Sequence, residues 1–257
     1  MNSLMDFLSN LKGQKIKYVA NPGNAGDSLI AKGTLCVFRQ LNLDFKICHI
    51  NNQFFGDTII YGGGGNLIDK YNDLRNFLWR NHEHNKIIVL PHTISHCDYL
   101  LQTINQNIYL FAREKVSHEY IKSNMKHTEN AFLSDDMAFF IEDLDLHINN
   151  SHIGECNAFR LDEEKTDIKI PADNKDISID LIHKENTFNE NHINISSNNL
   201  FSYLCKFKTI NTNRLHVGIA GALLGRQVNL YPNSYYKNKA VFDFSIKDKF
   251  PNVKFED

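Results

Sequence analysis

The segment most informative about the fold is Asn211-Thr212-Asn213-Arg214-Leu215-His216-Val217-Gly218-Ile219-Ala220-Gly221-Ala222-Leu223-Leu224-Gly225. The aromatic and β-branched residues just before it, Phe207 to Ile210, predict a strand. Within it, apolar residues recur at helical spacing from Val217 to Leu224, and Gly225 can end the helix. Small residues in this helix would let it lie close on a sheet. A strand that leads directly into a helix is typical of a wound α/β sheet.

The junction between this strand and this helix predicts an anion-binding pocket. The first amide groups of a helix have no partners within the helix, and the helix dipole is positive there, so both favour an anion. Arg214 and His216 lie on the turn, where both side chains can lean over one anion. The stretch alone leaves the identity of the anion open.

Length and composition limit the class of protein. The chain has 257 residues, of which 42% are hydrophobic, so we expect a packed core in one large domain or two of ordinary size. A formal charge of −2 is unlike that of a general nucleic-acid binder. The five cysteines are widely spaced without a CxxC pair, which favours reduced thiols in a cytoplasm. The start, Met1 to Gly13, does not resemble a signal peptide, and the longest apolar run is too short to span a bilayer.

Strands and helices alternate through the first 140 residues. Because loops after parallel strands share one edge of a sheet, we expect a ligand at the loops 21–28, 62–66, 91–95, 113 and 135–136. The predicted strands are Lys15–Ala20, Asp44–Ile50, Thr58–Tyr61, Ile87–Leu90, Asn107–Ala112 and Ala131–Leu133, and the predicted helices cover 30–41, Leu67–Arg80 and the residues after Arg113.

Two glycine-containing loops follow the first and third of these strands. The first, Gly23 to Ser28, is either a tight turn whose Asp27 or Ser28 caps the next helix, or a backbone that a ligand can approach. Its spacing does not match the dinucleotide pattern G-x-G-x-x-G. The second, Gly62 to Gly65, ends a buried strand, where missing side chains would leave room for a substrate and supply N–H donors.

The segment Pro91 to Asp98 raises the question of a metal site. His92 and His96 are four residues apart and could share a helix face. However, Pro91 favours a loop, and no glutamate follows His92 as in H-E-x-x-H. We therefore expect no metal here and interpret His92 as a substrate contact.

The second half predicts a smaller α/β unit. The polar segment Glu142 to His152 lacks periodicity and is interpreted as a linker between domains 1–145 and 146–257. This half is short for a full Rossmann domain, so we expect a reduced sheet, with residues 240–257 packing back on the first domain. The predicted elements are a strand at Cys156–Arg160, a loop at Leu161–Lys175, a strand at Ile177–Ile182, a helix at His192–Cys205 and a strand at Val228–Tyr231.

Taken together, these motifs resemble the polysaccharide pyruvyl transferase family. Two features depart from the family pattern: the usual Arg-Asp pair is Arg113-Glu114 here, and the chain is shorter than many members. The matching segments run in the family's order: Gly23-Asn24-Ala25-Gly26-Asp27, Gly62 to Asn66, Arg113-Glu114 with Ser117, Asp136 with Ala138-Phe139, Arg214-Leu215-His216, and Asn233 to Asn238.

The resemblance implies two Rossmann-like domains arranged as in GT-B glycosyltransferases, the second one reduced. The N-terminal domain would bind the acceptor and the C-terminal domain phosphoenolpyruvate. The enolpyruvyl carbons would move onto two hydroxyls of a sugar, giving a cyclic ketal and phosphate. The resemblance also implies a cytoplasmic enzyme that acts at the inner face of the plasma membrane on a sugar or lipid-linked oligosaccharide of a capsule or exopolysaccharide. We expect no cofactor, no metal and no nucleic-acid partner.

The resemblance also suggests the site residues. The arginine and histidine of the family motif are linked to the phosphoenolpyruvate site and carry over to Arg214 and His216. Because histidine as a residue type titrates near neutral pH, His216 is the best candidate for a proton shuttle. The predicted phosphoenolpyruvate contacts are Arg214, His216, Arg160, Asn213 and Lys237; the predicted catalytic residues are His216, Arg214, His92 and Asp136; and the predicted acceptor contacts are Asn24, Gly26, Asp27, Gly63, Gly64, Asn66 and Arg113.

Two other classes of protein remain open at this point. A GT-B glycosyltransferase that uses a nucleotide sugar would have the same fold, and Arg214 at a helix start could hold a diphosphate. Against it, the second half shows no acidic residue clearly placed for a ribose diol. A sugar-binding or regulatory protein could also keep the scaffold without the chemistry, although Arg214, His216 and both glycine loops argue for an enzyme.

Overall fold

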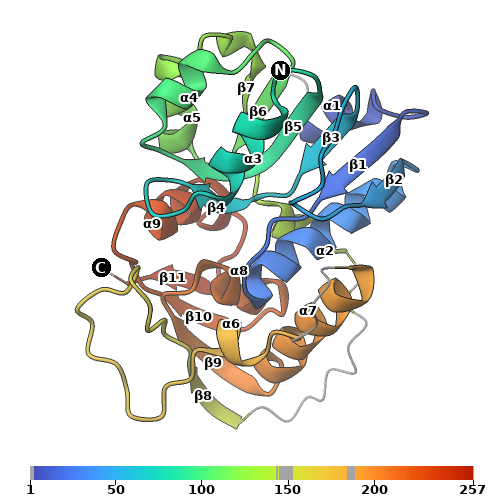
Figure 1. Ribbon diagram of the computed structural model, residues 1–257. Coiled ribbons are helices and arrows are strands. Elements are labelled where there is room, and N and C mark those ends of the chain that lie inside the picture. The colour runs from blue at the N-terminus through green and yellow to red at the C-terminus, as the bar shows by residue number, and fades with distance from the viewer. Residues whose placement is uncertain (1–2, 143, 145–152, 184–188, 257) are drawn as a thin grey trace.

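The protein contains two parallel β-sheets with helices packed against them (Figure 1). The computed structural model describes residues 3–142, 144, 153–183 and 189–256. The first sheet has seven strands in the order β2-β1-β3-β5-β6-β7, with β4 paired to β5 beyond β3. The second has four strands in the order β11-β10-β9-β8. The mixed α/β class predicted from the sequence is confirmed.

The first sheet is a doubly wound sheet. The chain places β2 on one side of β1 and then returns to place β3 on the other side, and such a change of direction marks the usual ligand edge. Its central strands are continuously apolar because helices cover both faces. The strands are β1 (Lys15–Val19), β2 (Asp44–Ile47), β3 (Thr58–Tyr61), β4 (Gly64–Leu67), β5 (Lys86–Ile94), β6 (Ile108–Ala112) and β7 (Ala131–Leu133). The helices are α1 (Leu4–Ser9), α2 (Ala25–Gln40), α3 (Asp73–Asn81), α4 (Asp98–Thr103) and α5 (Lys115–Asn124), with short 3₁₀ turns η1 (Thr128–Asn130) and η2 (Met137–Phe140).

The second sheet holds helix α8 (Leu215–Leu223) close to its face. Gly221 makes this possible, because a Cβ there would lie 2.8 Å from side-chain carbons of Ile210 and Val228. The remaining elements are β8 (Ile153–Asn157), α6 (Ile177–Asp180), α7 (Glu190–Leu204), β9 (Phe207–Thr212), β10 (Gln227–Leu230), α9 (Lys237–Val241), the π-turn η3 (Phe242–Ile246) and β11 (Val253–Phe255).

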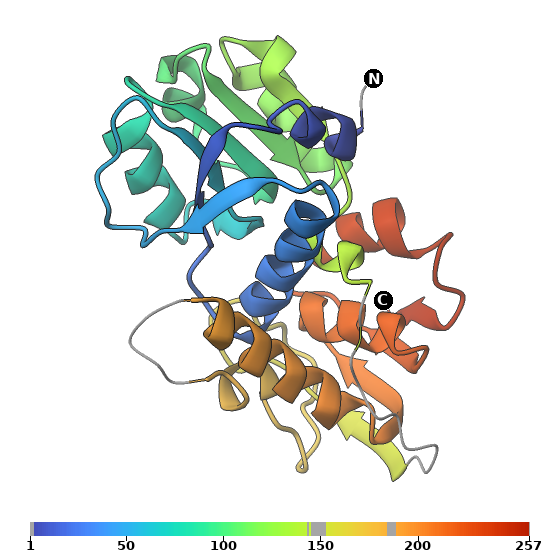
Figure 2. The same ribbon diagram turned by 90° about the vertical axis from the view of Figure 1, so that its right-hand side faces the viewer.

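Helix α2 packs between the two sheets (Figure 2). Its residues Ala25 and Leu29 belong to the core of the second sheet, whereas Leu35 and Phe38 belong to a core of the first. The predicted linker lies mostly outside the described residues, and the GT-B-like arrangement with a boundary at residue 145 stays a prediction. Strand β11 is the outer strand of the second sheet, while Lys249 and Phe250 next to it contact Asp135 and Phe139.

Several predicted elements differ from the structure. The segment Ile177–Ile182 was predicted as a strand but forms helix α6, because its backbone bonds run from Asp180 N to Asp176 O and from Leu181 N to Ile177 O. The helix predicted from Leu67 begins only at Asp73, since residues 64–67 pair with β5 as β4. In the second half, β8 covers 153–157 and not 156–160.

The segment after Ile87 also differs from the prediction. Strand β5 does not end at Leu90 but continues to Ile94, so His92 is in a strand and fully buried. A shift of register between Val89 and His92 accommodates Pro91, which has no N–H to donate. Similarly, helix α2 begins at Ala25, five residues before the predicted range 30–41.

Candidate functional site

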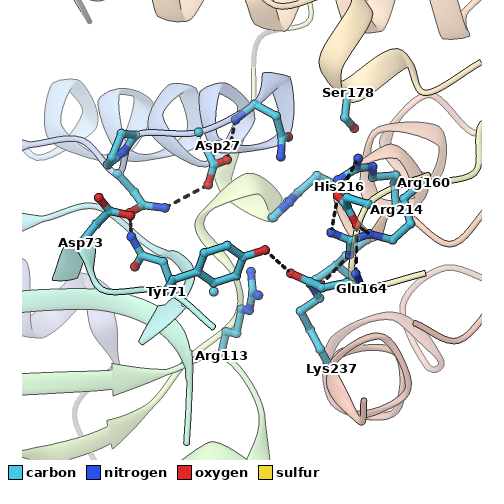
Figure 3. Close-up of a pocket in the computed structure, with 18 residues that line it drawn as sticks. Asp27, Tyr71, Asp73, Arg113, Arg160, Glu164, Ser178, Arg214, His216 and Lys237 are labelled. Carbon is cyan, nitrogen blue, oxygen red and sulfur yellow. Dashed lines mark hydrogen bonds and ion pairs between the residues drawn. The ribbon is translucent and has the colours of Figure 1, made fainter. Parts of the chain in front are cut away.

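A cavity of about 270 Å³ lies between the carboxyl ends of the two sheets, and we call it the main cavity (Figure 3). Ten of its lining residues come from the first sheet and its loops, and eight come from the second. Both groups follow strand ends, as expected for ligand sites in parallel sheets. The loops after β1, β4, β6, β8 and β9 all contribute.

The strand–helix junction that the sequence singled out forms one wall. Strand β9 ends at Thr212, Arg214 is the residue before helix α8, and its N–H donates to Thr212 Oγ1 at 3.0 Å. Asn213 does not line the cavity; its side-chain oxygen accepts from the Arg160 N–H at 2.8 Å. Asn213 therefore holds the chain that carries Arg160 against the chain that carries Arg214.

Asp162 bridges the two arginines of this wall. Its Oδ1 accepts from Arg160 Nε at 2.6 Å, and its Oδ2 accepts from Arg160 Nη2 at 3.0 Å and lies 2.9 Å from Arg214 Nη2. Arg214 is also paired with Asp176 through Nε (2.9 Å) and Nη2 (2.5 Å). Burial alone would raise the pKa of the Asp162 carboxyl, but Arg160 and Arg214 hold it below its usual range. Both guanidinium groups are thus already arranged around an anion.

Glu164 collects a second set of donors from both sides of the cavity. It accepts from Lys237 Nζ at 2.5 Å, Arg160 Nη1 at 2.6 Å and the Tyr71 hydroxyl at 2.8 Å. Figure 3 shows Tyr71 reaching across from the first-sheet side. Burial lowers the pKa of Lys237 to about 8, and the Glu164 carboxylate opposes this shift. Lys237 and Arg160 together keep the pKa of Glu164 well below its usual range, although burial alone would raise it.

Arg113 supplies a cation from the first-sheet side. Its Nη1 donates to Asp136 Oδ2 at 2.9 Å and its Nε to Thr93 Oγ1 at 2.9 Å. Gly65 lets the guanidinium reach the cavity, because a Cβ there would lie 2.8 Å from Arg113 Nη2. His216 Nε2 lies 3.3 Å from the same Asp136 oxygen. Burial alone would raise the pKa of Asp136, but His216 and Arg113 keep it well below its usual range.

Asp27 places a partly buried carboxyl group opposite this cluster. It accepts from the Asn24 N–H at 2.8 Å and from Asn21 Nδ2 at 3.0 Å. Burial raises its pKa, while His216 opposes the rise. Asn24, rather than Asp27 or Ser28, caps helix α2, and Asp27 completes a capping box. A carboxyl group with a raised pKa next to a histidine can exchange protons with a ligand.

The structure brings most of the predicted site residues to one cavity and sets others behind it. Gly63 and Gly64 do not provide the predicted space, because Cβ atoms there would lie 2.8 Å from Pro91 O and 2.6 Å from Asn21 Nδ2. Of the predicted site residues, those lining the cavity are Asn24, Asp27, Asn66, Arg113, Arg160, Arg214, His216 and Lys237, and those behind it are Gly26, Gly63, Gly64, His92, Asp136 and Asn213.

His92 orients a neighbour and does not reach the cavity. Its Nε2 lies 2.9 Å from Asn66 Oδ1 and its Nδ1 lies 3.1 Å from Leu90 O. Burial lowers the pKa of His92 to about 3, so the ring is neutral at physiological pH. His92 is therefore not in direct contact with the cavity, and its ring instead orients the side chain of Asn66, which does line the cavity.

The acidic residues that pair with the basic side chains of the cavity were not predicted from the sequence. Asp162 and Glu164 lie in a segment that was interpreted as a solvated loop, and Asp176 lies just after it. One signal was available: Arg160, Asp162 and Glu164 alternate, which places all three on one side of an extended chain. Tyr71, Asp73 and Ser178 are further lining residues without a clear sequence signal.

Two further properties of the described residues bear on the site. Nowhere in this part of the chain do three or more histidine, cysteine or acidic side chains form a group that could hold a metal ion. Among the same residues, every helix is too short or too polar to cross a bilayer.

The fold and the cavity define an α/β protein in which two parallel sheets surround a cavity with four basic side chains, Arg113, Arg160, Arg214 and Lys237. A family model described as polysaccharide pyruvyl transferase matches residues 24–235, and the chain belongs to this family. The family assignment supports a transferase that acts in polysaccharide biosynthesis.

A solved structure agrees with the assignment of the fold. A functionally uncharacterised protein from Klebsiella pneumoniae subsp. pneumoniae NTUH-K2044 is 34% identical over 98% of this chain and 96% of its own, with a TM-score of 0.85. No curated protein matches the chain.

Proposed function

We propose that the protein transfers the enolpyruvyl group of phosphoenolpyruvate onto two hydroxyls of a sugar, forming a pyruvate ketal and releasing phosphate. One observation carries the proposal: in a member of this family, Arg160 and Arg214 share one carboxylate at the start of a helix that faces the cavity. Phosphate and carboxylate groups prefer such forked guanidinium donors.

The donor would bind on the second-sheet side. Phosphoenolpyruvate carries a phosphate and a carboxylate, so it needs cations at two places. The phosphate would take the position of the Asp162 carboxylate between Arg160 and Arg214, since Asp162 is 41% exposed and can move into solvent. The carboxylate of the donor would lie toward Lys237 and Arg113, which reach the cavity from opposite sides.

The chemistry requires one proton donor and two proton acceptors. His216 would protonate the methylene carbon, and Asp136 would stabilise the imidazolium that carries this proton. The first sugar hydroxyl would then attack C2 and lose its proton to Asp27. The second hydroxyl would attack the same carbon as the bond between C2 and the phosphate oxygen breaks, and its proton would leave with the phosphate. Arg160 and Arg214 would stabilise the charge on the departing phosphate.

The acceptor would bind on the first-sheet side. Carboxylate and amide groups are suited to sugar hydroxyls because they accept and donate hydrogen bonds. Asp27, Asn66 and Asp73 line this side, and the interactions of Asn66 with Asn21 (2.6 Å) and His92 fix its orientation. The acceptor sugar would be part of a surface polysaccharide or its lipid-linked precursor.

The test is phosphate release from phosphoenolpyruvate with a panel of α- and β-galactosides, glucosides and N-acetylmannosamine glycosides. We expect acceptor-dependent release by the wild type. Arg214→Ala and His216→Ala should each reduce it by a factor of roughly 10² or more, the usual loss for a positioned acid–base or charge-stabilising group. Arg39→Ala is the matched control, because Arg39 pairs with Glu190 on the surface outside the cavity.

Calorimetry separates this proposal from the nucleotide-sugar glycosyltransferase. Phosphoenolpyruvate and UDP- or CMP-sugars are titrated separately into the wild type and the Arg214→Ala variant. Arg214-dependent binding of phosphoenolpyruvate supports the proposal. Binding of a nucleotide sugar without binding of phosphoenolpyruvate would overturn it.

A further inference from the structure

A second cavity, of about 430 Å³, lies between helix α3 and the start of helix α4, and we call it the aromatic groove. Arg75 and Trp79 of α3 form one side, and residues 96–100, around Tyr99, form the other. None of these residues lines the main cavity, and none was assigned a role from the sequence. The groove is therefore a separate feature of the first-sheet half.

The groove exposes an aromatic surface to solvent. Tyr99 is 75% exposed, and its ring lies 5.7 Å from the ring of Trp79 at an angle of 38°. A sugar ring has an apolar face of C–H groups and a rim of hydroxyls. Aromatic side chains with polar tips match such a ligand, since they cover the apolar face and leave the rim to nearby polar groups.

The polar groups beside these rings are held in place. Arg75 Nη2 donates to His96 O at 3.1 Å, which leaves other guanidinium N–H donors for a ligand. Asp98 accepts from the Tyr120 hydroxyl and keeps a second carboxylate oxygen. His96 is an exposed residue that lines the groove, and it has a backbone φ of +54°, a region that residues other than glycine seldom occupy. Such conformations persist where the surrounding structure enforces them, often at binding sites.

Helix α3 connects the groove to the main cavity. Its first residue, Asp73, lines the main cavity, and Trp79 lies six residues further along, roughly 9 Å at 1.5 Å per residue. A short oligosaccharide is long enough to cover this separation between Asp73 and Trp79 along the helix axis. A polymeric acceptor needs a surface beyond the reacting unit, and the groove provides one.

We propose that the aromatic groove binds a sugar unit of the acceptor chain beyond the unit that reacts. The role as an acceptor subsite rests on the proposed function, whereas the capacity to bind a saccharide rests on the groove itself. Tyr99 and Trp79 would stack on the sugar ring, and Arg75 and Asp98 would bind its hydroxyls.

The chain offers a direct reporter, because Trp79 is its single tryptophan. A printed array of defined bacterial oligosaccharides is probed with the wild type, Tyr99→Ala and Phe55→Ala. Phe55 is the matched control: it is 79% exposed, contacts His84, and lines neither of the two cavities. The glycan with the strongest signal is then titrated into each protein while the fluorescence of Trp79 is followed.

We expect the wild type and Phe55→Ala to bind the same glycans, with a saturable change in Trp79 emission, and Tyr99→Ala to bind them at least tenfold more weakly. Circular dichroism checks that each variant is folded. Absence of glycan binding by the wild type, or equal binding by Tyr99→Ala, would overturn the proposal. Calorimetry with phosphoenolpyruvate on the same proteins tests the proposed function separately, since Tyr99 lies outside the main cavity. If the wild type binds phosphoenolpyruvate but its glycan binding does not depend on Tyr99, only the proposal for the groove is rejected.

Discussion

Asp162 competes with any anionic ligand for Arg160 and Arg214. Because the Asp162 side chain is partly exposed, its ion pair with the buried arginines contributes about 1 kcal/mol, which corresponds to roughly a fivefold change in affinity. Asp162→Asn removes the competing charge, so we expect phosphoenolpyruvate and inorganic phosphate each to bind about fivefold more tightly in calorimetry. Glu163→Gln is the control, because it removes the same charge from the next exposed position. Weaker binding by Asp162→Asn would instead show that Asp162 positions the arginines.

Lys237 should make donor binding depend on pH. Because burial lowers its pKa to about 8, the ammonium group loses its proton as pH rises through 8, earlier than an ordinary lysine would. The affinity for phosphoenolpyruvate should therefore fall above pH 8, by roughly tenfold if one charged hydrogen bond of about 1.5 kcal/mol is lost. Lys237→Arg keeps its charge and should bind the donor equally from pH 7 to 10. Calorimetry across this range checks both proteins; a flat profile for the wild type would contradict the prediction.

At the scale of residues, the basic side chains of the site could be predicted from the sequence, but the acidic residues that pair with them could not. Arg214 and His216 could be predicted because a local strand–helix junction places them, and Arg160 lies three residues after β8, the strand that pairs with β9. Asp176 and Asp136 could not be paired with them, since their contacts join residues 38 and 80 positions apart. Contacts between residues so far apart in the chain become visible only in the folded structure.

Helix α8 sets the position of the donor wall through its contact with the second sheet. Gly221→Ala would place a methyl group 2.8 Å from Ile210 and Val228, so the helix must move outward. Overpacking of this kind costs about 1–3 kcal/mol, and we expect the midpoint of thermal unfolding to fall by several degrees, at roughly 2–4 °C per kcal/mol for a chain of this size. Gly218→Ala is the milder control, because its Cβ would lie 3.1 Å from the flexible end of Leu230. Equal midpoints for the wild type and Gly221→Ala would contradict this account.

At the scale of elements, the strands that were predicted from apolar runs agree best. Thr58–Tyr61 is predicted to the residue, because neighbours on both sides bury it. The error at Ile177–Ile182 arises from the sequence, in which Ile177, Ile179 and Leu181 alternate with polar residues as in a strand. In the structure Ile177 is buried and Ile179 is exposed, as a helix allows, and no strand of the described sheets pairs with this segment. The extension of β5 through Pro91 was missed because a proline usually ends a strand.

At the scale of the whole molecule, α2 is the element that the sequence could not place. The sequence predicts its helical spacing but not that its apolar residues face two different cores. A helix buried on several sides has this wide apolar surface, yet the pattern does not say which sheet each side contacts. In the structure, Leu29 packs in the second core and Phe38 in the first, so one rigid helix joins both walls of the main cavity.

This shared helix predicts that the two sheets unfold together. Leu29 is fully buried, and truncating a buried leucine to alanine costs about 2–5 kcal/mol. Leu29→Ala removes contacts of the second core, whereas Trp79 packs against a first-sheet core. If α2 couples the sheets, Leu29→Ala should lower the urea midpoint of Trp79 fluorescence and of far-UV circular dichroism by the same amount, in one transition. If the two halves unfold independently, the urea midpoint of Trp79 fluorescence would equal that of the wild type, while circular dichroism would show an additional transition at lower urea concentration. Arg39→Ala, also on α2 but in an exposed ion pair, should leave both midpoints nearly unchanged.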